Sequence, residues 1–218
     1  MYFASRVQAG RMLAPRLVDK YRYENCAVLA LNDGGVVLGA QIAAQLHCVL
    51  GLLVLSEIAL PRESEAIGAI AMDGTFSYSG NFSSSEIDEM QSEYRGFLEE
   101  QKLTKLHEMN RLLVRGGTMP PELLQGNHVI LVADGLRGQS LLTAAEAYLK
   151  PIKHSRIIVV TPMADVPALD KIHIMADEIH CLNVVDDTFE INHYFDKNDV
   201  PDHETIVKII ENIILHWQ

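Results

Sequence analysis

An apolar run that ends on an acid is the sequence feature that most constrains the fold. Residues 129–132 read Val-Ile-Leu-Val; Asp134 follows, then a glycine-bearing turn and a helix-like run from Ser140. Consecutive apolar residues rich in β-branched side chains are typical of a strand buried on both faces, as in parallel sheets covered by helices. The stretch therefore predicts a strand–loop–helix unit of an α/β protein, with Asp134 at the carboxyl end of the strand.

A second unit of the same kind lies near the start of the chain. The apolar residues 27–31 predict a strand, and residues 36–47 carry the apolar spacing of a helix. Residues 52–55 predict the next buried strand, so the order is strand, loop, helix, strand, which forms a right-handed parallel unit. The loop between the first strand and the helix has the residues of a tight turn. These residues are Asn32, Asp33, Gly34 and Gly35.

The remaining segments complete an α/β pattern without an internal repeat or a linker. Residues 1–218 are therefore expected to form a single domain, and the acidic segment 185–202 is expected to be a solvated loop. A capping box at Ser83 predicts the start of a long helix. Helices are expected over 5–20, with a break at Pro15, and over 86–114, 167–175 and 205–217, and strands over 67–71, 157–160 and 178–184.

Composition excludes several classes of protein. The net charge is −11 with histidine neutral, which argues against a nucleic-acid-binding protein, because such proteins need clustered lysine and arginine. The most apolar segment, 49–55, is far shorter than the ~20 residues that cross a membrane. The three cysteines are scattered, as is usual for a reducing compartment. We therefore expect a soluble cytoplasmic protein that binds neither nucleic acid nor membrane.

The two loops that follow buried strands are the candidate ligand site. In open α/β sheets, ligands bind at the carboxyl ends of the strands, and the backbone N–H groups at a helix start favour anions. The loop after Asp134 is therefore a candidate phosphate loop. The other interpretation is an ordinary turn, with Asp134 as a turn residue and Ser140 as the helix N-cap. The loop comprises Gly135, Leu136, Arg137, Gly138, Gln139 and Ser140.

The nine histidines raise the question of a metal centre. None of them shows the His-Glu-x-x-His spacing or another recognised ligand set, and no Walker A or Gly-x-Ser-x-Gly motif occurs. No metal site is expected from the spacing of the residues alone.

Six further blocks of sequence lie in order along nearly the whole chain. The blocks are Phe3-x-x-Arg6-x-x-Ala9-Gly10-x-x-Leu13-Ala14, Gly34-Gly35-Val36, Ile58-x-x-Pro61-x-x-x-Glu65-Ala66-Ile67-Gly68-Ala69-Ile70 with Asp73-Gly74, Gly126-x-x-Val129 leading to Asp134-Gly135, Thr161-Pro162-Met163-Ala164, and Ala176-Asp177-Glu178. Together these blocks resemble the type I phosphoribosyltransferases, in particular stand-alone bacterial members.

The resemblance implies a mainly parallel sheet of five strands, flanked by helices, with a small hood above the carboxyl edge. It also implies a dimer and the transfer of ribosyl phosphate from phosphoribosyl pyrophosphate, bound with Mg²⁺, to a base. In the family, two adjacent acids hold the ribose hydroxyls and a following loop holds the 5′-phosphate. An arginine before Gly-Gly and a flexible lysine hold the pyrophosphate.

This chain departs from the family at the positions that bind the donor. Asp33 replaces the arginine, Glu57 replaces the lysine, and Ala133 replaces the first acid, so that only Asp134 is left. The phosphate loop is one residue short, with Arg137 near the expected threonine. Two charge reversals place acids where a pyrophosphate would lie, which is unfavourable. We interpret Asn32, Asp33, Gly34, Gly35 and Glu57 as a degenerate pyrophosphate loop.

The leading hypothesis is a phosphoribosyltransferase-fold protein with lost or altered donor chemistry. It would bind a phosphorylated small molecule through loop 135–140, or act as a regulatory or partner-binding subunit. The first alternative is an active transferase with a purine or pyrimidine acceptor, in which Asp134 is catalytic and Mg²⁺ joins Asp33 and Glu57 to the donor. The second is a ligand-free homodimeric scaffold that uses the helix over 86–114 as its interface.

Overall fold

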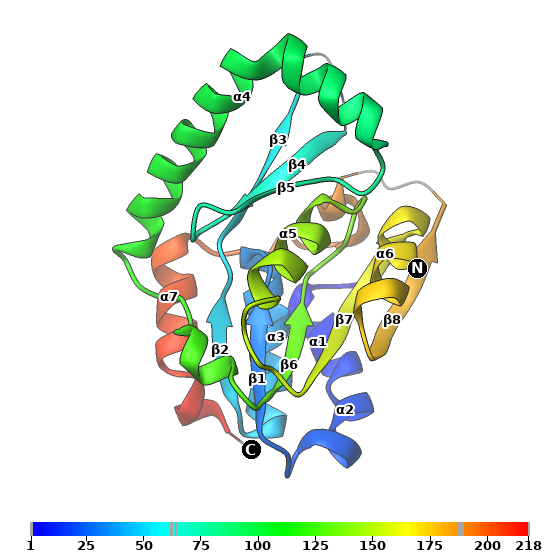
Figure 1. The fold of residues 1–218 in the computed structure, drawn as a ribbon. Helices are drawn as coiled ribbons and strands as arrows, with labels where there is room; N and C mark the ends of the chain where they lie inside the picture. Colours follow the sequence, from blue (N-terminus) through cyan, green and yellow to red (C-terminus); the bar gives the residue numbers. More distant parts are fainter. Residues whose placement is uncertain (1, 62, 64, 187–189, 218) are drawn as a thin grey trace.

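The apolar runs of the sequence form a parallel sheet at the centre of the molecule (Figure 1). The computed structural model describes residues 2–61, 63, 65–186 and 190–217. The sheet has five strands in the order β2-β1-β6-β7-β8, and every pair of neighbours is parallel. The strands are β1 (Cys26–Ala30), β2 (Val49–Leu52), β6 (His128–Val132), β7 (Arg156–Asp165) and β8 (Glu178–Val185).

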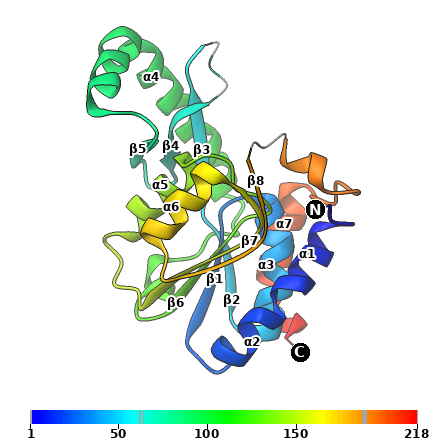
Figure 2. The same ribbon diagram turned by 90° about the vertical axis from the view of Figure 1, so that its right-hand side faces the viewer.

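Helices cover both faces of the sheet (Figure 2). The strands have apolar residues facing both ways: Val28 and Ile130 pack against the α3 side, whereas Leu29 and Leu131 pack against the α5 side. This double burial explains why the strands read as continuous apolar runs. One face carries α1 (Arg6–Leu13), α2 (Pro15–Tyr21), α3 (Asp33–Leu46) and α7 (His203–Glu211), and the other carries α5 (Ser140–Leu149) and α6 (Val166–Met175).

The register of the sheet brings the two candidate loops to one edge. Ala30, the last residue of β1, is level with Val132, the last residue of β6. Leu31 also donates its backbone N–H to the carbonyl of Val132, at 2.9 Å. The chain therefore leaves both strands side by side, and Asn32 and Asp134 come within hydrogen-bond distance.

A hood stands above this edge, as the resemblance implied. It consists of a three-stranded antiparallel sheet, in the order β3-β4-β5, and a 30-residue helix, α4, that arches over it (Figure 1). The hood begins and ends at the same place, because Leu52 donates its N–H to the carbonyl of Gly117, at 2.9 Å. Its elements are β3 (Leu55–Ala59), β4 (Ala66–Ala71), β5 (Phe76–Tyr78) and α4 (Ser84–Leu113).

Several predicted boundaries were wrong. The strand expected over 52–55 was misplaced, because β2 spans Val49–Leu52 and the hood strand β3 begins at Leu55. The strand expected to close at residue 160 continues to Asp165, since β8 pairs with it on one side and Leu136 bridges to Ala164 on the other. The last helix is shorter than expected, because α7 ends at Glu211. Single-turn helices lie at 121–124, 191–194 and 213–216. No helix among the described residues has the length and apolar character needed to span a membrane.

Candidate functional site

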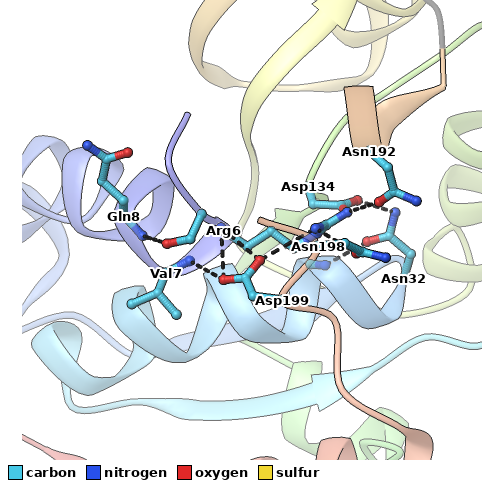
Figure 3. A network of polar contacts seen from close by, with 10 residues as sticks. Arg6, Val7, Gln8, Asn32, Asp134, Asn192, Asn198 and Asp199 are labelled. Carbon is cyan, nitrogen blue, oxygen red and sulfur yellow. Dashed lines mark hydrogen bonds and ion pairs between the residues drawn. The ribbon is translucent and has the colours of Figure 1, made fainter. Parts of the chain in front are cut away.

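Asp134 lies at the carboxyl end of β6, as predicted, but its carboxylate is already engaged by the protein (Figure 3). The Nε of Arg6 donates to Oδ2 at 2.6 Å, and the Nδ2 of Asn32 donates to Oδ1 at 2.8 Å. The residue is 4% exposed. Both oxygens of the acid that was expected to hold a ribose or a metal therefore accept hydrogen bonds from neighbouring side chains.

Arg6, the partner of Asp134, is the site residue that sequence reasoning missed. Arg6 lies in α1 and is 1% exposed. Its other contacts come from the single-turn helix η2 (Ile191–Tyr194) and from the segment that follows it. Nη2 donates to Oδ1 of Asn192 at 2.5 Å, and Nη1 donates to Oδ1 of Asn198 at 3.3 Å. Nη1 also lies 3.5 Å from Oδ1 of Asp199. We call these contacts, together with Asp134 and Asn32, the Arg6 network.

The Arg6 network corrects the prediction that 185–202 is a solvated loop. Asp199 also accepts backbone N–H groups of α1, from Arg6 at 3.1 Å and from Val7 at 3.4 Å. The guanidinium carbon of Arg6 lies 4.4 Å from the centre of the Phe195 ring. Residues 187–189 lie outside the described residues. Nothing in the sequence pairs Arg6 with this segment, because the burial of Arg6, which requires an acidic partner, appears only in the structure.

The predicted tight turn at Asn32-Asp33-Gly34-Gly35 is instead the start of α3. Asn32 is the N-cap, and its Oδ1 accepts the N–H of Gly35 at 2.7 Å. A Cβ on Gly34 would lie 2.0 Å from Oδ2 of Asp134, and one on Gly35 would lie 2.6 Å from the carbonyl oxygen of Val132. The two glycines therefore let α3 approach the end of β6, a role that requires no bound pyrophosphate.

Asp33, which replaces the expected arginine, faces the N-terminus of α7. Its Oδ1 lies 3.9 Å from Nδ1 of His203, whose side chain is 10% exposed. Burial raises the pKa of Asp33, and the nearby Asp134 adds to the effect, whereas His203 opposes it. A carboxylate in place of the arginine makes this edge unfavourable for an added anion.

Two donors of loop 135–140 are also engaged by carboxylates. Gly138, at φ +61°, donates its N–H to both carboxylate oxygens of Asp165, at 3.0 and 3.1 Å. The hydroxyl of Ser140 donates to Oε1 of Glu57. The interpretation of Ser140 as an N-cap was wrong, because Gln139 holds that position and Ser140 is the first residue of α5.

A cavity of about 240 Å³ adjoins this loop and is acidic. Four carboxylates line it, and Arg137 is the one base among the described residues of its lining. Asn32 to Gly35 are not among these residues. Glu57 therefore lies at loop 135–140, whereas Asn32 belongs to the Arg6 network and Asp33 faces His203. The acidic residues are Glu57, Glu65, Asp165 and Asp186.

The residues at this edge do not fit the Mg²⁺ ion that the family resemblance implies. Both oxygens of Asp134 accept hydrogen bonds from cationic or amide nitrogens. Across the part of the chain that the structure describes, no group of three or more histidine, cysteine, aspartate or glutamate side chains is placed to hold a metal ion. Magnesium prefers an octahedral shell of oxygen ligands, whereas both oxygens of Asp134 already accept hydrogen bonds from Arg6 and Asn32.

A parallel five-stranded sheet with a hood above its carboxyl edge, and helix starts gathered at that edge, defines the phosphoribosyltransferase class of α/β protein. The chain belongs to this family, because the model of the phosphoribosyl transferase domain matches residues 3–196.

Proteins that are similar to this chain carry the same family name or share its fold. Two Mycobacterium tuberculosis proteins, from strains CDC 1551 and H37Rv and provisionally named phosphoribosyl transferases, are each 26% identical over 181 residues. The match covers 83% of this chain but 40% of theirs, so this chain spans about two-fifths of their length. The crystal structure of TT1426 from Thermus thermophilus has the same fold, with a TM-score of 0.72 at 22% identity, covering 96% of this chain and 98% of that one.

Proposed function

We propose that this chain is a phosphoribosyltransferase-fold protein that no longer transfers ribosyl phosphate from phosphoribosyl pyrophosphate and acts as a regulatory or partner-binding protein. The observation that carries the proposal is the engagement of Asp134 by Arg6 and Asn32. Removing one partner of a buried ion pair costs about 3–5 kcal/mol, so a ribose that displaced Arg6 would have to offset that cost.

The charges around the edge support the same proposal. Asp33 and Glu57 stand where the family has cations, and Glu57 contributes to a cavity that four acids line. Like charges held in contact without water cost several kcal/mol, on the order of the whole affinity of a weak ligand. Binding of a phosphorylated small molecule by loop 135–140, expected from the sequence, is not part of this proposal, and the homodimer stays a prediction.

The test is an assay of pyrophosphate release together with a binding screen. The protein would be incubated with phosphoribosyl pyrophosphate, magnesium and a panel of purine and pyrimidine bases. Its melting temperature would be recorded with the same donor, with ribose 5-phosphate and with nucleoside monophosphates. We expect no release, and no greater stabilisation by the donor than by ribose 5-phosphate. Release above the rate of a heat-denatured control would overturn the proposal.

An active transferase is the second candidate, favoured by the names of the two Mycobacterium tuberculosis relatives. In that case Arg6 must leave Asp134 during turnover, since the donor needs the carboxylate. Asp134→Asn, which preserves the shape of the side chain, should then abolish pyrophosphate release. An unchanged rate in Asp134→Asn would remove Asp134 from the catalytic machinery.

A further inference from the structure

We propose that Asp165 is a built-in anion of loop 135–140 and that its carboxylate keeps phosphate groups out of the loop. The inference deepens the proposed function and rests on it, since it names a contact that blocks the phosphate end of the site. The inference can be tested directly, because replacing this one carboxylate with a neutral side chain should create an anion site.

The loop offers an anion the donors that such sites use. The left-handed conformation of Gly138 turns its N–H toward the interior, and α5 begins two residues later. Backbone N–H groups beside a helix N-terminus are attractive to negative charge. In this chain the negative charge comes from Asp165, which is 6% exposed and accepts the Gly138 N–H with both oxygens, at 3.0 and 3.1 Å.

Asp165 is fixed in this position by two independent sets of contacts. It is the N-cap of α6, where its Oδ1 accepts the N–H of Ala168 at 2.9 Å. Its backbone is tied to the loop, because its N–H donates to the carbonyl of Leu136 at 3.1 Å and Leu136 donates to the carbonyl of Met163 at 3.0 Å. Moving the carboxylate away would therefore uncap α6, while the backbone of Asp165 would stay tied to the loop.

Glu57 provides a second carboxylate at the same loop. Its Oε1 accepts the hydroxyl of Ser140, the first residue of α5, and α5 has no side-chain cap of its own. An acid beside a helix N-terminus is stabilised by the helix dipole. A phosphate entering the loop would meet two negative charges, with Arg137 as the one base of the described lining.

The decisive experiment compares three forms of the full chain. Isothermal titration calorimetry with inorganic phosphate and with ribose 5-phosphate would be carried out on the unmodified protein, on Asp165→Asn and on Asp202→Asn. Asparagine can still cap α6 through its side-chain oxygen, but it removes the charge and directs an N–H₂ donor toward the loop. Asp202 is the N-cap of α7, where it accepts the N–H of Thr205 at 2.9 Å, and it is not part of the cavity lining, so Asp202→Asn is a matched control.

We expect Asp165→Asn to bind both anions at least about tenfold more tightly than the unmodified protein, which corresponds to about 1.4 kcal/mol, and Asp202→Asn to show no gain. If the anion affinities of Asp165→Asn and of the unmodified protein differ by less than about twofold, the inference is overturned. If Asp165→Asn does not fold, as judged by circular dichroism, Asp165→Ser, which can also cap α6 but carries no charge, decides by the same criteria. Pyrophosphate release by the unmodified protein would overturn the proposed function, whereas an unchanged anion affinity would overturn only the role of Asp165.

Discussion

Arg6 joins parts of the chain that are far apart in the sequence, and its removal should be costly. Arg6→Met would leave the buried carboxylate of Asp134 without its cation, a change that typically costs about 3–5 kcal/mol. The double variant Arg6→Met/Asp134→Leu should recover most of this loss, because replacing both charges with apolar groups leaves neither unpaired. The measurement is the free energy of unfolding in urea.

Lys208→Met is the control for this prediction. Lys208 pairs with Glu204 on the outer surface of α7, with both side chains more than half exposed. Exposed pairs contribute little to stability, so the urea midpoint should stay that of the unmodified protein. A double variant no more stable than Arg6→Met would contradict the assignment of the loss to an unpaired Asp134.

Gly34 offers a test of the claim that its role is packing against Asp134. Gly34→Ala should lower the free energy of unfolding by at least about 2 kcal/mol, because the added methyl group would lie inside the contact distance of the carboxylate and of Arg6. The matched control is Gly96→Ala in α4, where nothing lies within 4 Å of the new Cβ. That change should stabilise the protein by roughly 0.5–1 kcal/mol. Equal effects at the two glycines would contradict the packing role.

Glu178, on β8, should make stability depend on pH in the acid range. Burial acts to raise its pKa, but hydrogen bonds from Lys20, Tyr21 and His180 outweigh burial and hold the pKa at about 2, against an ordinary value of 4.5. A depressed pKa contributes stability that is present above pH 4.5 and is lost as the pH falls toward 2. We expect Glu178→Gln to lose roughly 1–3 kcal/mol at pH 7, and the difference from the unmodified protein to vanish near pH 2. A difference that persists at pH 2 would exclude linkage to this carboxyl group.

At the scale of elements, the sequence predicted most helices and strands because their periodicity is local. The strand expected over 27–31 is β1, the helix expected over 86–114 is α4, and the break expected at Pro15 separates α1 from α2. The errors occur where a distant segment decides the outcome. For example, β7 extends to Asp165 because Leu136 pairs with that extension, and no local pattern in 157–165 records the pairing.

The candidate site shows the same difference between local features, which were predicted, and distant contacts, which were not. Asp134 was predicted at the end of its strand because an apolar run followed by an acid is a local feature. Its partner Arg6 is 128 residues away in the sequence, and Asp165 lies 27 residues from Gly138. The sequence therefore identified the acids that are out of place for a donor site, but it could not show that the site is filled by side chains of the chain itself.

At the scale of the whole molecule, α4 offers no obvious interface for the predicted homodimer. The helix expected over 86–114, now α4, was the candidate dimer interface. Its apolar residues Met90, Tyr94 and Phe97 instead pack toward the hood sheet. Leu103, 60% exposed, is the large apolar residue that α4 leaves to solvent. Stable interfaces bury roughly 800 Å² on each partner around an apolar centre, and one leucine does not provide that centre. A dimer in solution would therefore use another surface.

The arrangement of body and hood predicts unequal stability within one molecule. The chain leaves and re-enters the body at a single point, between Leu52 and Gly117, and the hood sheet is also tied to α5 through Glu57 and Ser140. The helix α4 can therefore detach without separating the strands of the central sheet. Two of the 30 residues of α4 are buried, Leu98 and Met109, whereas ten of the 14 residues of α3 are. Segments with few buried apolar contacts open at a lower free energy than the core.

Native-state hydrogen exchange measures this difference. We expect the amides of α4 to exchange through partial opening, several kcal/mol below the free energy of global unfolding, and those of β1, β6 and α3 to exchange only with global unfolding. Low concentrations of urea should leave the slowest exchange in α4 almost unchanged, because little surface is exposed when a single helix detaches. If α4 and α3 showed the same exchange free energy and the same urea dependence, hood and body would unfold together, and α4 would have to be held by more than its two buried residues.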